Sequence, residues 1–520
     1  MTESIKLAIV GLDGASPNIY NQFVEEIPTL SRTIEQGSSG TLHSTTPPIT
    51  GPAWTTMMTG KNPGSHGVFD MATPDKNYDV QPLQANRDQP ALYDYIDDSL
   101  MINVPGSYPR RPAGKAMLVH SFDCPSSAIA IPEELADLPA AEDYLLSNPK
   151  SEYSKEVPYM KRLREIESRR FDFLQQSLDQ VGSVEILFVL FSSTDWALHF
   201  LTDLSTPGGK ELKRLYADID SYTNWIEQRA ENLLIMSDHG FERKQLRVNN
   251  ARFLESNGYM RFENNVGEES QPIPKKALGL LTSGVSAASQ RSVIIQRVIQ
   301  WAIKNIASDE FVAEARDSWS IETDWERTEA FPTGYQGIYL NRKGKFRNGF
   351  VDSKQAEEIQ TSIINKLKLL TDKYGNDVFK HVLRREDVYH GAYVMEAPDI
   401  ICIPKSHVVC HSVPNANDRI INDIQIFDHR KDGMYAGIGP MFSQGANADF
   451  DIADIAPTVL HILGRPIPST MDGQPMSAAI DTDHEVEFTE KETAVGPFGD
   501  APSDHESDKV KERLQDLGYI

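Results

Sequence analysis

Short apolar runs recur along the chain and indicate its strands. KLAIVGL (6–12), EILFVLFSS (185–193), NLLIMS (232–237) and DIICI (399–403) are rich in β-branched and large aliphatic residues. Runs of this length and composition are typical of strands that are buried on both faces of a parallel sheet. Between them, residues 159–178 and 210–231 carry apolar side chains at helical spacing. Strands that alternate with helices predict an α/β fold with a doubly wound, mostly parallel sheet flanked by helices.

The pattern changes after residue 241 and again near residue 480. We expect residues 242–385 to form an insertion or cap over the sheet, with a helix at 292–306 and a loop or hairpin near 337–349. The core would then comprise residues 1–241 and 386–478. Residues 479–520 are acidic and poor in apolar side chains, a composition that favours a disordered tail.

Net charge, apolar runs and cysteine content limit the partners and the cellular compartment that we expect for this protein. The 520 residues carry a net charge of −24, and such an acidic chain would repel a phosphate backbone, so we expect no nucleic-acid polymer as a partner. No apolar run is long enough to span a bilayer and the first residues do not resemble a signal peptide, so we expect no membrane association. The three scattered cysteines fit a reducing compartment. We predict a cytoplasmic enzyme.

Acidic residues follow three of the predicted strands. Asp13 follows the first run, Asp195 and His199 follow the second, and Asp238 and His239 follow the third. Ligands bind beyond the carboxyl ends of strands in open α/β sheets, so these side chains should share one crevice. A single aspartate at a strand end is more often a helix cap or a turn residue, but the whole set favours a metal centre. Mixed Asp and His ligands suit Zn²⁺, Mn²⁺ or Fe²⁺ better than Mg²⁺ or Ca²⁺.

The stretch TTPPITGPAWTTMMTG (45–60) contains the candidate nucleophile. Thr50 precedes Pro52 and an apolar segment that can begin a helix, so its hydroxyl could simply cap that helix. A threonine hydroxyl is a poor nucleophile by itself, but a divalent metal would activate it. The metal centre predicted above therefore favours Thr50 as a nucleophile over Thr50 as a cap.

Several motifs occur in an order that resembles a known family. They are ITGPAWTTMMTGKNPGSHGVFD (49–70), DWALH (195–199), SDHGF (237–241), HRKDGMYAGIGP (429–440) and DIADIAPTVLHILGRPIPSTMDG (451–473). Together they resemble the type I phosphodiesterase/nucleotide pyrophosphatase-like family of the alkaline phosphatase superfamily.

The resemblance implies an alkaline-phosphatase-like fold and a two-metal centre. It places one divalent ion on Asp195, His199 and His429, and a second on Asp13, Asp238, His239 and Thr50. We expect both ions to be Zn²⁺, with Mn²⁺ or Fe²⁺ as alternatives. Thr50 would be the catalytic nucleophile, and the amide of Gly51 would bind the transferring group.

Charge counting favours one class of substrate. Two divalent ions exceed the charge of Asp13, Asp195 and Asp238 by one, which a singly negative diester would balance. We therefore predict a metal-dependent phosphodiesterase acting on a small-molecule phosphate ester. The alternatives are a phosphomonoester or phosphonate hydrolase, a phosphosugar mutase on the same core, and a non-catalytic binding protein.

Overall fold

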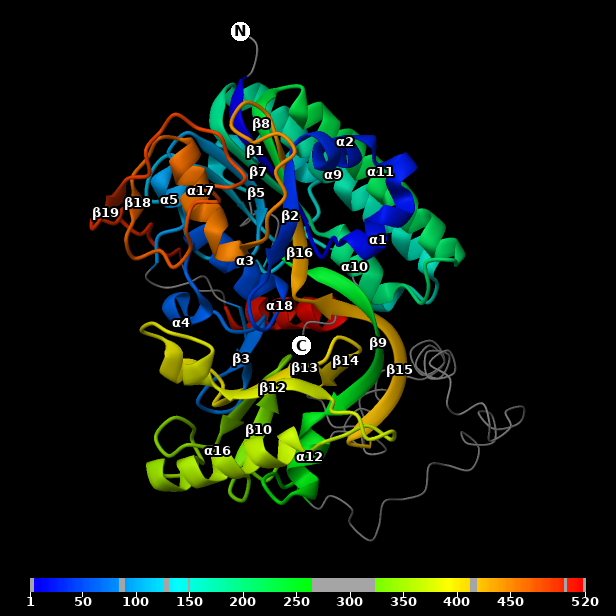
Figure 1. The fold of residues 1–520 in the computed structure, drawn as a ribbon, viewed down its shortest axis with the longest axis vertical. Coiled ribbons are helices and arrows are strands. Elements are labelled where there is room, and N and C mark those ends of the chain that lie inside the picture. Colours follow the sequence, from blue (N-terminus) through cyan, green and yellow to red (C-terminus); the bar gives the residue numbers. More distant parts are fainter. Residues whose placement is uncertain are drawn as a thin grey trace.

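The computed structural model describes residues 4–83, 89–125, 131–147, 150–263, 323–411, 419–499 and 503–517. Figure 1 shows an α/β core joined to a smaller, β-rich cap. The helix predicted at 292–306 lies outside the described residues. Within the described ranges, no helix combines the length and apolarity needed to cross a membrane.

An eight-stranded sheet forms the centre of the core. In spatial order its strands are β17 (Phe450–Asp451), β2 (Ser38–His43), β16 (Asp432–Ile438), β8 (Ala230–Met236), β1 (Ile5–Leu12), β7 (Val184–Phe191), β5 (Ser99–Val104) and β6 (Met117–His120). β1 pairs in parallel with β7 and β8, whereas β16 runs antiparallel to β8 and β2. The predicted mostly parallel sheet is therefore confirmed.

Helices cover both faces of this sheet, as a doubly wound fold requires (Figure 1). Successive residues of β1 point to opposite faces, so Ala8 and Val10 pack in one hydrophobic core while Leu7 and Ile9 pack in another. The first core is built with α1 (Pro17–Tyr20), α2 (Pro28–Gln36), α9 (Glu156–Val181), α10 (Ser193–Phe200) and α11 (Pro207–Glu227), and the second with α3 (Thr50–Thr59), α5 (Leu92–Tyr95) and α17 (Ile455–Ile462). Shorter elements are α4 (Pro63–His66), α7 (Glu133–Ala136), α8 (Pro139–Glu142), β3 (Ala72–Pro74), β4 (Val80–Pro82), β18 (Ile467–Pro468) and β19 (Phe488–Thr489).

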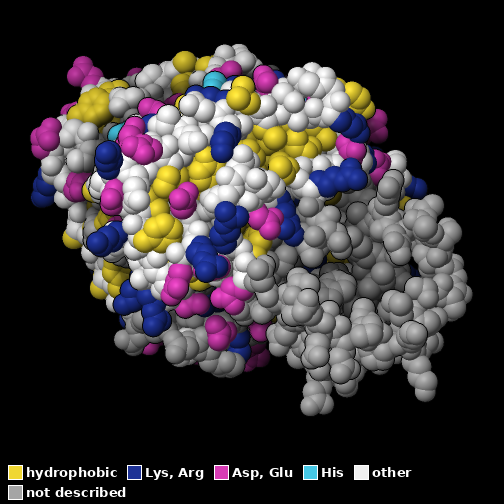
Figure 2. All heavy atoms as spheres, turned by 90° about the horizontal axis from the view of Figure 1, so that it is seen from below, with side chains coloured by type: hydrophobic (Ala, Val, Ile, Leu, Met, Phe, Trp, Pro, Cys, Tyr) yellow, Lys and Arg dark blue, Asp and Glu magenta, His cyan; other side chains and the backbone are white. Residues whose placement is uncertain are grey.

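The cap has two small sheets and a hydrophobic core of its own. One sheet contains β14 (Val408–His411), β9 (Gly240–Asn249) and β15 (Ile421–Arg430), and the other contains β10 (Ala330–Thr333), β11 (Gly337–Leu340), β13 (Ile400–Pro404) and β12 (Phe379–Arg384). Two helices, α12 (Asn250–Ser256) and α16 (Ser353–Lys368), complete it. Seen from below the cap, basic and acidic side chains are interspersed over the described surface (Figure 2).

One predicted strand of the central sheet belongs to the cap instead. The run 399–403 forms β13, which pairs antiparallel with β11 and β12. Ile400 and Cys402 are buried in the cap core, so an apolar run was read correctly as a strand but assigned to the wrong sheet. The proposed boundary at residue 386 falls between the paired strands β12 and β13, and we propose that the cap extends into β15.

The acidic C-terminal segment also differs from its prediction of disorder. Residues Asp504–Leu517 form α18, and its buried side chains Val510, Leu514 and Leu517 join the first core. Arg513 donates hydrogen bonds to the carbonyl oxygens of Phe122 and Cys124, both at 2.6 Å. Few apolar residues are present, but they recur at helical spacing and share one face. This placement brings α18 between the core and the cap (Figure 1).

Candidate metal centre and nucleophile

Three parallel strands deliver acidic side chains to one edge of the sheet. Asp13 follows β1, Asp195 lies in the first turn of α10 after β7, and Asp238 follows β8. Because these strands run in parallel, their carboxyl ends meet, and all three aspartates are fully buried there. The structure thus brings together the residues that the sequence places at three distant positions.

One group of candidate ligands combines α10 with β15. Asp195 and His199 lie one turn apart on α10, and Asp195 Oδ1 is 3.5 Å from His199 Nε2. His429, near the end of β15, places its Nε2 at 3.1 Å from Asp195 Oδ1 and at 2.8 Å from His199 Nε2. The three side chains meet from two elements that are far apart in sequence.

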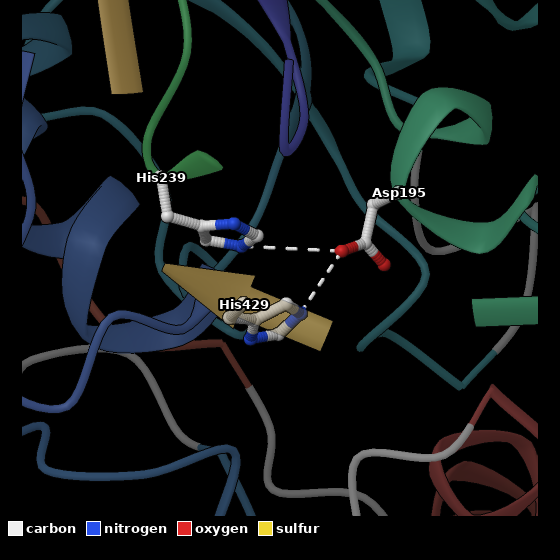
Figure 3. A group of neighbouring side chains, drawn as sticks. All are labelled: Asp195, His239 and His429. Carbon is white, nitrogen blue, oxygen red and sulfur yellow. Dashed lines mark hydrogen bonds and ion pairs between the residues drawn. The ribbon is translucent and has the colours of Figure 1, made fainter. Parts of the chain in front are cut away.

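A second group lies beside the first. His239 Nε2 is 3.3 Å from Asp238 Oδ2 and 3.7 Å from Asp13 Oδ1. Thr50 donates its hydroxyl to Asp13 Oδ1 at 3.4 Å. His239 Nε2 is also 3.9 Å from Asp195 Oδ1, so the two groups are in contact through these two residues. Figure 3 shows His239, Asp195 and His429 pointing toward one another.

These spacings fit two metal ions. Ligands at about 2.0–2.1 Å from a tetrahedral Zn²⁺ lie about 3.3 Å from one another. The measured separations within the two groups, from 2.8 to 3.7 Å, bracket this value. Two clusters of three buried donors lie close enough together to hold an ion: Asp195, His239 and His429, and Asp13, Asp238 and His239. His199 extends the first cluster through its contacts with Asp195 and His429. Both clusters contain the carboxylate and imidazole donors that divalent ions bind.

The electrostatics of the site also favour bound cations. Burial, together with the nearby charges of Asp238 and Asp195, raises the pKa of Asp13 well above its ordinary value. Burial raises the pKa of Asp238 to about 8 and lowers the pKa of both His199 and His429 to about 3. The histidines are therefore neutral, which is their ligand form, and the carboxylates lack compensating charge.

Unpartnered polar atoms point to the same conclusion. Asp13 Oδ2, Asp238 Oδ2 and His239 Nε2 are buried and have no hydrogen-bond partner among the described residues. Leaving a buried carboxylate oxygen without a donor or a cation is costly. The donor set therefore fits two divalent ions, and these residues are the ones that would hold them.

The hydroxyl of Thr50 is directed toward a candidate metal ligand. It is the first residue of α3, and Ile49 occupies the N-cap position without a side-chain cap. The Thr50 hydroxyl bonds to Asp13, as described above, so a capping role does not account for its orientation. The neighbouring amide of Gly51 faces the sulfur of Met71 at 3.1 Å. Sulfur is a weak acceptor, so this amide is only weakly engaged.

Comparison with known proteins identifies the family. A family model described as type I phosphodiesterase / nucleotide pyrophosphatase matches residues 7–419. The chain belongs to this family. Membership and fold place this phosphodiesterase-family protein in the alkaline phosphatase superfamily, among metal-dependent phosphoryl hydrolases, and the resemblance seen in its motifs is confirmed.

Solved structures support the fold of this family member. Two structures of phosphonoacetate hydrolase from Sinorhizobium meliloti 1021, in complex with phosphonoformate and with phosphonoacetate, are 14% and 13% identical to it. Their TM-scores are 0.51 and 0.50, and each covers 84% of this chain and 90% of the hydrolase chain. No curated protein sequence matches this chain.

Two residues next to the candidate site of this phosphodiesterase-family protein are not predicted from the sequence. Met71 lies against Gly51, and Tyr335 from the cap lies beside His429. Met71 follows the quoted nucleophile motif directly, and its position was a usable signal. Tyr335 lies in an irregular loop of the insertion, where no spacing or motif distinguishes it.

His66 of the PGSHG turn gives this family member a pH-dependent stability that does not involve the candidate metal ligands. Its Nε2 bonds to Thr56 Oγ1 at 2.9 Å and its Nδ1 accepts the Val68 amide at 3.1 Å. Burial lowers the pKa of His66 to about 3, below the value of about 6.5 for an unfolded histidine. The stabilisation is therefore complete above pH 6.5 and is lost as the pH falls toward 3.

We expect His66→Gln to reduce the acid sensitivity of the fold. The wild-type free energy of unfolding should fall by up to about 1.4 kcal/mol more per pH unit than that of the variant between pH 6 and pH 4. Denaturant unfolding of both proteins in chelator, at a series of pH values, measures this difference in slope. Equal slopes would show that His66 is not held neutral in the folded protein.

Proposed function

We propose that this protein hydrolyses a small-molecule phosphate diester, with Thr50 as the nucleophile and two divalent ions, most suitably Zn²⁺, bound by the two groups of ligands described above. The observation that supports the nucleophile is the direction of the Thr50 hydroxyl, which bonds to Asp13 within the second group. A hydroxyl that shares its site with metal ligands is placed for activation.

The charges around the centre favour a diester over a monoester. Two divalent ions exceed the three buried carboxylates by one positive charge, and a singly negative diester balances it. Arg430 pairs with Asp432 at 2.5 Å, and Lys244 donates to Glu242 and to the carbonyl of Ser406, so the charges of these two cations are balanced locally. Lys150 also lies near the centre, where it donates to the carbonyl oxygen of His199 at 3.3 Å. The preference for a diester therefore rests on the charge of the ions and the three carboxylates.

The reaction would proceed by two displacements at phosphorus. The Thr50 oxygen forms a bond to phosphorus while the bond from phosphorus to the leaving alcohol oxygen breaks, and the alcohol takes up a proton. Water then displaces Thr50 and releases the phosphate monoester. Asp13 fixes the Thr50 oxygen in position through their hydrogen bond. When bound, the two ions would lower the pKa of the nucleophile and stabilise the charge of the transition state.

A comparison of three substrates tests the proposal. The protein, supplied with Zn²⁺ or Mn²⁺, is assayed with bis-p-nitrophenyl phosphate, p-nitrophenyl phosphate and phosphonoacetate. We expect kcat/KM for the diester to exceed the others by at least about 10-fold, a difference of about 1.4 kcal/mol in transition-state stabilisation. A higher kcat/KM for the monoester or the phosphonate would overturn the assignment of a diester substrate. Absence of turnover with all three substrates would overturn the proposed hydrolysis of phosphate esters.

A further inference from the structure

A loop of the cap reaches directly into the candidate metal centre. Tyr335 lies between β10 and β11, and its half-buried ring packs beside the imidazole of His429. The two ring centroids are 5.4 Å apart and the ring planes are inclined by 31°. The loop between β10 and β11 therefore contacts a side chain that we place among the metal ligands.

Asp428 connects the same two residues through hydrogen bonds. The Tyr335 hydroxyl donates to Asp428 Oδ1, and the backbone amide of His429 donates to the same oxygen at 2.7 Å. Asp428 is itself buried, so this carboxylate is held at a fixed position. The backbone amide of His429 and the hydroxyl of Tyr335 thus donate to the same oxygen, Asp428 Oδ1, while the rings of His429 and Tyr335 pack against each other.

The opposite side of the loop is anchored near the nucleophile. The Tyr335 amide donates to Asp70 Oδ2 at 3.1 Å, and Asp70 Oδ1 accepts the Met71 amide at 2.7 Å. At Gly334, which has a φ of +32°, a Cβ atom would lie 1.7 Å from Asp70 Oδ2, so only glycine permits this close approach. The loop is therefore held by two buried carboxylates, Asp428 beside His429 and Asp70 beside Met71.

We propose that Tyr335 is a positioning residue, which holds the His429 imidazole in the orientation that binds a divalent ion. The inference rests on the metal centre of the proposed function but not on the reaction or its substrate. Removing a group that hydrogen-bonds directly to a metal ligand typically costs about 10–100-fold in metal affinity or activity. Tyr335 acts on His429 through ring packing and through the shared partner Asp428, so we expect an effect at the low end of this range. Tyr335 lies in the loop between β10 and β11, so this loop of the cap supports the candidate metal centre in addition to β15, the strand that carries His429.

Tyr339 provides a matched control. It lies on β11, is buried, and donates its hydroxyl to the carbonyl oxygen of Glu396 at 3.1 Å. Its hydroxyl thus has a backbone partner within the cap rather than the carboxylate next to His429. Removing either hydroxyl costs one hydrogen bond of the cap, but only Tyr335→Phe removes a bond to the carboxylate that also accepts the His429 amide.

The experiment measures metal binding rather than turnover. Metal-free wild type, Tyr335→Phe and Tyr339→Phe are titrated with Zn²⁺ against a chromophoric chelator, and the Co²⁺-substituted proteins are compared by visible absorption. We expect Tyr335→Phe to weaken one of two sites by about 10-fold, the low end of the range for direct partners of a ligand, and to alter the Co²⁺ spectrum, because Asp428 loses the bond that holds it beside His429. Tyr339→Phe should retain wild-type affinities and the wild-type spectrum.

The outcomes separate this inference from the proposed function. Unchanged affinity and spectrum in Tyr335→Phe, with two sites in the wild type, would overturn the positioning role alone. Equal losses in both variants would also overturn it, since the effect would then follow from the cap fold. Absence of tight binding in the wild type would instead contradict the metal centre on which the proposed function depends.

Discussion

Thr50→Ala should reduce the turnover of the best diester substrate by at least about 10³-fold while leaving the protein folded. The substitution removes the oxygen that attacks phosphorus, whereas its structural cost includes the long hydrogen bond to Asp13. That bond and the lost methyl group contribute about 1–2 kcal/mol to stability. Steady-state rates and denaturant unfolding, measured on the same preparations, test both parts of the prediction.

Two further variants make this result specific. Thr50→Ser keeps the hydroxyl and should retain part of the activity, and rapid quenching of the wild type should trap phosphate on the peptide that contains Thr50. Thr59→Ala removes another buried hydroxyl of α3, which donates to the Thr55 carbonyl at 2.7 Å, and should leave turnover within a few-fold of wild type. A near-normal rate in Thr50→Ala would show that water attacks phosphorus directly.

Asp13→Asn should have opposite effects on the metal-free and the metal-loaded protein. Without ions, burial and the nearby charges of Asp238 and Asp195 disfavour an ionised carboxylate at Asp13, so replacing it by a neutral amide should raise the free energy of unfolding. With ions at 100 times their dissociation constants, each site adds about 2.7 kcal/mol to wild-type stability, and the variant should lose one of these two contributions. Unfolding in chelator and in excess Zn²⁺ gives both quantities.

Asp220→Asn is the control for this experiment. Asp220 is a buried carboxylate on α11 that accepts the amides of Thr29 and Leu30 at the start of α2, at 3.0 and 2.9 Å. Its loss should lower stability equally with and without ions, because the contact does not involve the metal centre. If Asp13→Asn behaved in the same way, Asp13 would be a structural residue and not a ligand.

The sequence predicts those site residues that directly follow a strand of the central sheet. Asp13, Asp195 and Asp238 could be located because each follows an apolar run that folds as a strand of the central sheet, and parallel strands bring their carboxyl ends together. His199 could be added because it lies one turn after Asp195 on the same helix. These inferences require only periodicity and strand direction.

Other parts of the molecule depend on contacts between distant segments. His429 lies on β15, whose position beside β9 is not apparent from its own pattern, so only the family resemblance indicated a ligand there. The strand at 399–403 joined the cap because an apolar run does not specify its partners. α18 was missed because its low apolar content outweighed the regular spacing of its buried residues.

The placement of the antiparallel strand β16 completes both the central sheet and the candidate metal centre, because β16 adds β2 to the sheet and brings His429 to the other ligands. β2 joins the sheet through β16, in which Tyr435 pairs with Gly40, and only Lys431 separates β16 from the strand that carries His429. Such long-range pairing forms slowly. During synthesis, β2 therefore has no β16 to pair with until the whole cap has been made. In that interval the unpaired edge of β2 can pair with a wrong strand. Chaperone dependence during synthesis would be a natural property of this architecture.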